Sequence, residues 1–100
     1  MTLFENNTHF LMDYSQFTET LAREGFAEVV LVERQADGHL DVHVHPFEAK
    51  ALVLEGDVRI REEDDTERTY KTGEIFHLPA NRAHEEWYGA NGVRYLVGRK

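Results

Sequence analysis

Residues 38–56 read GHLDVHVHPFEAKALVLEG and contain two segments with the character of β-strands. Residues 40–45 (LDVHVH) alternate between apolar and polar side chains, which is the period of a strand. Residues 49–54 (AKALVL) form a second apolar segment, which ends at Glu55-Gly56-Asp57. Because successive side chains of a strand point to opposite faces, we expect His43 and His45 to leave the first strand by the same face.

Turn-forming residues divide the rest of the chain into further short strands. Gly56-Asp57 predicts a tight turn into a strand at 58–61, and residues 62–66 (EEDDT) predict a solvated acidic hairpin tip. About eight short strands with turns between them favour an all-β barrel or sandwich over a βαβ fold. The other predicted strands are 28–34, 67–71, 75–78, 83–88 and 93–99, with Gly89-Ala90-Asn91-Gly92 as the last turn.

One amphipathic helix is predicted before the strands. Asp13 can cap its first turn, and Phe17 and Leu21 recur at helical spacing with Tyr14. Gly25 stands where a residue in the left-handed conformation would end the helix. We therefore predict a helix over 13–25 and a β-barrel from residue 27 to residue 99, within a single domain of residues 1–100.

The composition excludes several classes of protein. The chain has 100 residues, no cysteine, and 11 Lys+Arg against 19 Asp+Glu, a net charge of −8. The acidic balance argues against a nucleic-acid binder, and the lack of cysteine excludes disulfides, Fe–S clusters and thiolate catalysis. The first ten residues lack the features of a signal peptide, and no apolar run approaches the roughly 18 residues of a membrane helix. We expect a cytoplasmic protein without nucleic-acid or membrane partners.

Two stretches resemble the conserved motifs of the cupin superfamily. The first motif is a glycine, a His-x-His pair, a glutamate three or four residues later and a glycine seven residues after the glutamate. Residues 38–56 match it through Gly38, His43, His45 and Gly56. Residues 73–88 (GEIFHLPANRAHEEWY) resemble the second motif, G-x5-P-x-G-x2-H-x3-N, through Gly73, Pro79 and His84.

The resemblance implies both a fold and a metal site. The fold is the cupin-type double-stranded β-helix, a jelly-roll barrel, here with one short N-terminal helix. The implied metal ligands are His43, His45 and His84, which would hold a divalent transition metal such as Fe, Mn, Ni, Zn or Cu. The choice among these metals stays open, because imidazole suits several of them.

The sequence departs from the motifs at the position of the metal-binding carboxylate. Counted back from Gly56, the usual glutamate falls on Ala49, and its neighbour Glu48 would point to the other face of a regular strand. Asn81 and Tyr88 replace the glycine and the asparagine of the second motif. A site of three histidines leaves a coordination position for water, substrate or oxygen. The alternative is that Glu48 reaches the metal through a bulge, or that Glu86 does.

Several other residues are candidates for the pocket. Glu86 and Tyr88 share a strand face with His84 and can serve as hydrogen-bond acceptor, catalytic acid or base, or substrate contact. The alternative for Glu86 is a solvated or paired carboxylate. His77 points either into the barrel or to the surface, and Arg82 contacts either an anionic substrate or solvent. His9 and His39 are predicted to be surface residues.

Two functions follow from the resemblance. The first is a metal-dependent enzyme of dioxygenase or isomerase type that acts on a small molecule. The second is a non-catalytic module that binds or senses a small ligand, and a barrel without a retained site is the third possibility. Small cupins are commonly homodimers, and Leu52 and Leu54, on the face opposite Val53, need cover from a partner subunit or from the N-terminal segment.

Overall fold

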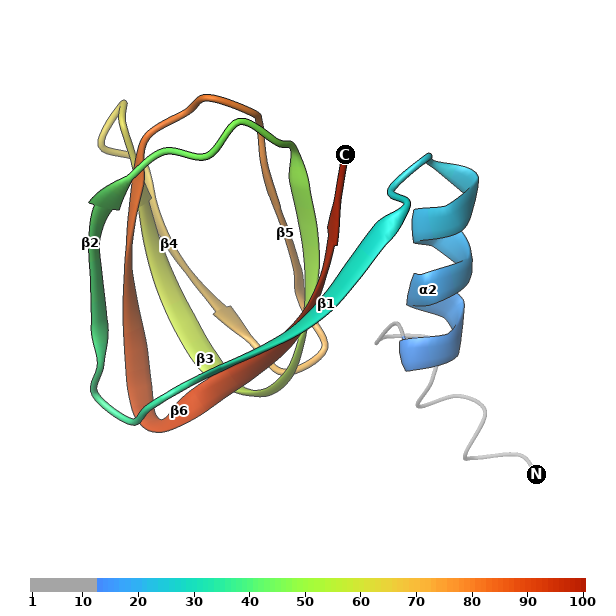
Figure 1. The fold of residues 1–100 in the computed structure, drawn as a ribbon. Helices are drawn as coiled ribbons and strands as arrows, with labels where there is room; N and C mark the ends of the chain where they lie inside the picture. The colour runs from blue at the N-terminus through green and yellow to red at the C-terminus, as the bar shows by residue number, and fades with distance from the viewer. Residues whose placement is uncertain (1–12) are drawn as a thin grey trace.

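The fold is seen in a computed structural model that describes residues 13–100. Among these residues one helix, α2 (Tyr14–Arg23), precedes six strands, which confirms an all-β fold with one short helix (Figure 1). His9 and the rest of residues 1–12 lie outside the described part of the chain. The strands are β1 (Glu28–Arg34), β2 (His39–His43), β3 (Ala49–Glu62), β4 (Glu67–Lys71), β5 (Ile75–Leu78) and β6 (His84–Arg99).

Helix α2 is slightly shorter than the predicted 13–25, and it lies between the predicted cap Asp13 and the predicted stop Gly25. The Asp13 carboxylate accepts a hydrogen bond from the backbone N–H of Gln16 at 2.8 Å, and the Gln16 side chain faces back toward the N–H of Asp13. This reciprocal cap satisfies donors that the first turn of a helix leaves free. Gly25 follows the helix with φ +85°, a left-handed conformation that glycine adopts without strain.

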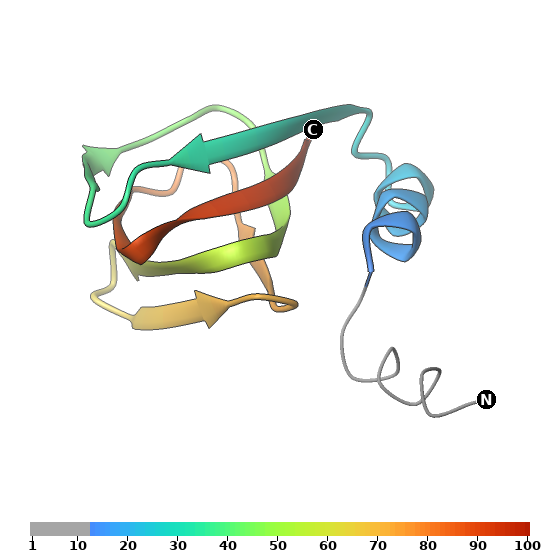
Figure 2. The same ribbon diagram turned by 90° about the horizontal axis from the view of Figure 1, so that it is seen from below.

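The two long strands β3 and β6 are the middle strands of the sheet that forms the barrel. They pair with each other in antiparallel fashion, β5 and β4 pair with successive parts of β3, and β2 and β1 pair with successive parts of β6. The sheet therefore curls around an interior, with α2 outside it beside β1 and the C-terminus (Figures 1 and 2). Among residues 13–100, no helix is long and apolar enough to cross a membrane.

Two of the predicted turns are wrong, and eight predicted strands become six. Strand β3 continues through Gly56-Asp57, and β6 continues through residues 89–92. Gly56 and Gly92 adopt φ +75° and +73°, and the β3–β6 register shifts beside them. A Cβ added at Gly56 would overlap the carbonyl oxygen of Gly92. The glycines bend two paired strands at the same level instead of reversing either one.

The described residues form two apolar clusters on opposite faces of the sheet. Val53, Val58 and Tyr95 belong to the cluster inside the barrel, and Leu52 belongs to the cluster between the sheet and α2. Gly98 allows that second contact, since a Cβ there would lie 2.7 Å from the Cδ2 atom of Leu21. The other members of the outer cluster are Phe17, Leu21, Phe26 and Leu96, with Leu54 and Ile75 partly buried against it. Helix α2 thus supplies the cover that Leu52 needs.

Candidate metal centre

The structure brings together the three histidines of the two motifs. His43 ends β2, His45 follows it in the connection to β3, and His84 begins β6 directly opposite His43. The ring centroids lie 4.1 Å apart for His43 and His84, and 5.0 Å apart for His45 and His84. One ring nitrogen from each histidine lies within 4.8 Å of the others, a spacing that a single divalent ion can bridge.

Backbone carbonyls orient all three rings in the same way. The Nδ1 atoms of His43, His45 and His84 lie 2.8, 3.1 and 3.2 Å from the carbonyl oxygens of Asp41, Phe47 and Arg82. A carbonyl oxygen only accepts a hydrogen bond, so each Nδ1 carries the proton. Each Nε2 then keeps its lone pair for a metal.

His84 has a buried ring nitrogen that no group among residues 13–100 satisfies. This atom, Nε2, accepts and donates no hydrogen bond within the described part of the chain. The nearest carboxylate oxygen, Oε2 of Glu86, lies 3.4 Å away. A buried polar atom without a partner is costly. An unpartnered Nε2 aimed at two further imidazoles fits a metal-binding role.

Glu86 and Tyr88 extend the site into the barrel, as their shared strand face predicts. The Oε2 atom of Glu86 lies 3.7 Å from Nε2 of His43, and Oε1 accepts a hydrogen bond from the Tyr88 hydroxyl at 3.2 Å. Both residues are buried. Glu86 is therefore paired inside the barrel rather than solvated.

Burial and the neighbouring charges set the protonation of this cluster. Burial raises the pKa of Glu86, but the adjacent His84 and His43 outweigh it and hold the pKa below its usual value. Burial lowers the pKa of His84, yet contact with Glu86 and with the Arg82 carbonyl raises it overall. Burial also lowers the pKa of His45. Burial and the charge of Glu86 raise the pKa of Tyr88 to about 12, so its hydroxyl is a donor at neutral pH.

Glu48 does not reach the histidines. Its Oε2 atom contacts Nε2 of His77 on the outside of the barrel, and no bulge turns it inward. His77 is therefore an exposed surface residue. Ala49 takes the inward position and lines the cavity beside the histidines. Its methyl group cannot bind a metal, so among the described residues the nearest carboxylate to the three imidazoles is that of Glu86.

A cavity of about 210 Å³ runs from the histidines into the barrel. The ring of Phe47 forms part of its wall and stacks on His45 with a centroid distance of 4.1 Å. Two cationic residues that belong to no sequence motif, Arg34 and Arg99, also line it. The sequence of β1 does indicate that Arg34 faces the interior, because Arg34 continues the inward-facing alternation of Val30 and Val32.

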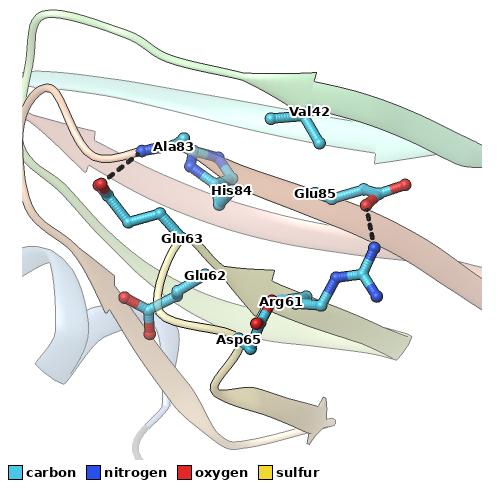
Figure 3. Close-up of a pocket in the computed structure, with 8 residues that line it drawn as sticks. All are labelled: Val42, Arg61, Glu62, Glu63, Asp65, Ala83, His84 and Glu85. Carbon is cyan, nitrogen blue, oxygen red and sulfur yellow. Dashed lines mark hydrogen bonds and ion pairs between the residues drawn. The ribbon is translucent and has the colours of Figure 1, made fainter.

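A second pocket lies near the β3–β4 hairpin, and the buried His84 lines it together with Arg61 and Glu85 (Figure 3). The two oxygens of Glu85 there accept hydrogen bonds from Arg61 and His39, both at 2.6 Å. Although His39, Asp41 and Glu85 have a spacing suited to a metal, the guanidinium group already neutralises the carboxylate. His39 is exposed, as predicted, and stacks on Trp87.

The acidic hairpin tip is held rather than freely solvated. Arg82 forms ion pairs with Glu62 at 2.9 Å and with Asp64 at 3.1 Å. Glu63 accepts a hydrogen bond from the backbone N–H of Ala83 (Figure 3). The guanidinium group of Arg82 is therefore paired with carboxylates of the hairpin, and Arg82 does not line the histidine cavity. These contacts tie the hairpin to the segment that positions His84.

The family model of the cupin domain matches residues 30–96, which include all three histidines. The chain belongs to the cupin family. No curated protein matches this cupin. The resemblance of the two histidine motifs is thus confirmed by a match over most of the barrel.

Solved structures share the fold of this cupin at low sequence identity. The cupin domain of Cnp3 from Schizosaccharomyces pombe superposes with a TM-score of 0.65 and 18% identity over 71% of this chain and 50% of that one. The DMSP lyase DddQ from Ruegeria pomeroyi superposes with a TM-score of 0.67 and 21% identity, over 72% of this chain and 36% of the lyase. An oxalate decarboxylase variant from Bacillus subtilis superposes with a TM-score of 0.67 and 15% identity, over 80% of this chain and 23% of the decarboxylase. This cupin spans half the length of the first structure and about a third of the second.

Proposed function

We propose that this cupin binds one divalent transition metal through His43, His45 and His84 and acts on a small molecule in the adjoining cavity. The proposal is carried by the buried Nε2 atom of His84, which has no hydrogen-bond partner among the residues that the structure describes. The carbonyl bonds that hold every Nδ1 atom protonated support it, because they leave three nitrogens free on one side of the cluster. Fe, Mn, Ni, Zn and Cu all accept such ligands.

The residues around the metal suit proton movement at a small substrate. A bound metal would act there as a Lewis acid. The Oε2 atom of Glu86 lies 3.4 and 3.7 Å from the nitrogens of His84 and His43, so the carboxylate can complete the ligand set or accept a proton from the substrate. The Tyr88 hydroxyl stabilises that carboxylate through its hydrogen bond. This arrangement supports dioxygenase- or isomerase-type chemistry, with Glu86 and Tyr88 as the catalytic residues.

One observation favours the alternative of a binding or sensing module without catalysis. Ala49 occupies the position of the usual metal carboxylate. A metal held by fewer charges can serve to anchor a ligand rather than to transform it. Turnover of a substrate by the loaded protein separates the two functions.

We infer that two copies of the chain associate through the outer face of β1. Val29 and Leu31 are 43% and 51% exposed on this strand, which pairs only with β6 among the described residues. Exposed apolar side chains on an edge strand are typical of an interface between subunits. Light scattering at micromolar concentration should give the mass of a dimer, and Leu31→Glu should halve it. A monomer mass for the unaltered protein would contradict the interface.

Metal analysis tests the proposed site. The purified protein, stripped with chelator and titrated with nickel, should bind one ion per chain, whereas His43→Ala, His45→Ala and His84→Ala should each weaken binding at least about tenfold. His77→Ala is the matched control, because this exposed histidine contacts Glu48 outside the barrel. Circular dichroism shows whether each variant is folded. Unchanged nickel affinity in the three folded variants, or equal loss in His77→Ala, would contradict the proposal.

A further inference from the structure

Two arginines line the histidine cavity without a close acidic partner in the described structure. Arg34 ends β1 and Arg99 ends β6, and both continue the inward-facing alternation of their strands. The nearest carboxylate contact of Arg99 is 3.9 Å, from Nη1 to Glu28. Arg34 donates a hydrogen bond to the backbone oxygen of Glu33, and no ion pair joins it to a carboxylate within residues 13–100.

Five of the six other arginines, all except Arg68, form an ion pair at 2.6–3.5 Å. The chain has 19 acidic residues for 11 Lys+Arg, so a guanidinium group finds a carboxylate easily. Arg61, Arg82 and Arg94 all have one within 2.9 Å. The Nε atom of Arg99 is instead buried without any hydrogen-bond partner in the described structure. An unsatisfied buried donor at a cavity wall indicates a place for an acceptor that comes from outside.

The side chain of Arg99 is held beside the histidines by stacking. Its guanidinium carbon lies 4.8 Å from the centroid of the Phe47 ring, and Phe47 in turn stacks on His45 with an interplanar angle of 4°. Burial raises the pKa of Tyr95, and the charges of both arginines oppose that rise. Both cations therefore act on the same interior side chain, although they come from opposite ends of the β1–β6 ladder.

We propose that Arg34 and Arg99 select a small molecule that carries a carboxylate group. This proposal rests on the proposed function, since it names the class of ligand that the metal-bearing cavity takes. The planar guanidinium group matches a carboxylate in two parallel hydrogen bonds. Val32, Phe76 and Val97 line the cavity as well and suit an apolar body. At about 210 Å³ the cavity is smaller than the roughly 300–1,000 Å³ of drug-sized sites, so the acid is a small one.

Matched acids and amides test this selectivity. The probes are butyrate and benzoate, each compared with its primary amide, which has nearly the same shape without the charge. Calorimetric titration uses chelator-stripped protein first, because a bound metal would itself attract carboxylates, and nickel-loaded protein second. We expect at least one acid to bind the stripped protein ten-fold or more tightly than its amide. Arg34→Met and Arg99→Met should each reduce that preference at least five-fold.

Arg68→Met is the matched control variant. Arg68 lies over the ring of Tyr70, outside the cavity lining, and its loss should leave the preference unchanged. Equal binding of acids and amides would overturn the proposal, as would a preference that survives both cavity substitutions in folded protein. Acid binding that needs nickel and ignores the arginines would refute the carboxylate site but keep the metal site. Arginine-dependent binding of the acid to a protein that takes up no nickel would keep the carboxylate site but refute the metal site.

Discussion

Glu86 is the residue on which the proposed chemistry of the site depends most. It lies two residues after His84 on β6, and its carboxylate contacts two imidazoles and the Tyr88 hydroxyl. The strand alternation places Glu86 and His84 on one face, which is why the sequence could name Glu86 as a candidate for the site. The same reasoning could not decide between Glu86 and Glu48, because only the structure shows that Glu48 stays outside with His77.

Glu86→Gln tests the role of that carboxylate at nearly constant shape. The amide keeps the size of the side chain but removes its charge, and it binds metals less well. We expect nickel affinity to fall about 10- to 100-fold, as it does when groups supporting a metal are altered. Calorimetric titration measures the effect, and Glu85→Gln serves as the control, because Glu85 bonds to Arg61 outside the barrel. An unchanged affinity in folded Glu86→Gln would show that the carboxylate does not support the metal.

The residues that sequence reasoning missed are those whose role depends on the closing of the barrel. His43, His45 and His84 belong to spaced motifs and could be predicted. Arg34 and Arg99 belong to no motif, and each reads as an ordinary charged residue at a strand end. Their common position arises only because β1 and β6 pair and curl around one interior. Local pattern cannot predict that two strand ends share a cavity.

At the scale of elements, the paired glycine bends explain why the sequence predicts eight strands where the described structure has six. Gly56-Asp57 and residues 89–92 have the composition of hairpin turns, and the sequence signal for a bend was correct. Whether such a bend reverses the chain depends on its partner, and here β3 and β6 bend together and stay paired. Strands β1, β4 and β5 begin and end as predicted, because their neighbouring turns are real.

A pair of glycine substitutions isolates the contact between the two bends. Gly56 and Gly25 both have positive φ, so alanine at either position should cost about 1–2 kcal/mol for the backbone alone. At Gly56 the added Cβ also overlaps the Gly92 carbonyl, whereas at Gly25 the nearest atoms lie 3.9 Å away. Urea unfolding should show Gly56→Ala to be less stable than Gly25→Ala by more than about 1 kcal/mol. Equal losses would mean that the strands are not in contact there.

At the scale of the whole molecule, an ion pair from Glu24, the residue that follows helix α2, ties the helix to the barrel. Lys50 of β3 donates to the carboxylate of Glu24 at 2.7 Å, and Lys100 donates to the Glu24 backbone oxygen at 2.7 Å. The hydrogen bond from Lys50 lowers the pKa of Glu24 against a smaller opposing effect of burial. A lowered carboxyl pKa contributes stability above the ordinary value of 4.5, and that contribution is lost as the pH falls through the folded-state pKa.

Glu24→Gln should therefore lower the melting temperature at pH 7 and have a shrinking effect below pH 4.5. Differential scanning calorimetry from pH 7 to pH 3 measures the difference between the two proteins. Glu19→Gln is the control, because Glu19 pairs with Arg23 within the helix and does not join it to the barrel. A difference that stays constant or grows on acidification would contradict the tie between Glu24 and Lys50.

The location of a bound metal is the most direct test of the whole account. Two groups of side chains among residues 13–100 have the spacing to hold an ion: His43, His45 and His84 inside the barrel, and His39, Asp41 and Glu85 outside it. Crystals grown with nickel allow anomalous diffraction to locate the ion. The account predicts one peak at about 2.0–2.2 Å from the Nε2 atoms of the three inner histidines. A peak at the outer group, or none between the inner histidines of a fully nickel-soaked crystal, would contradict it.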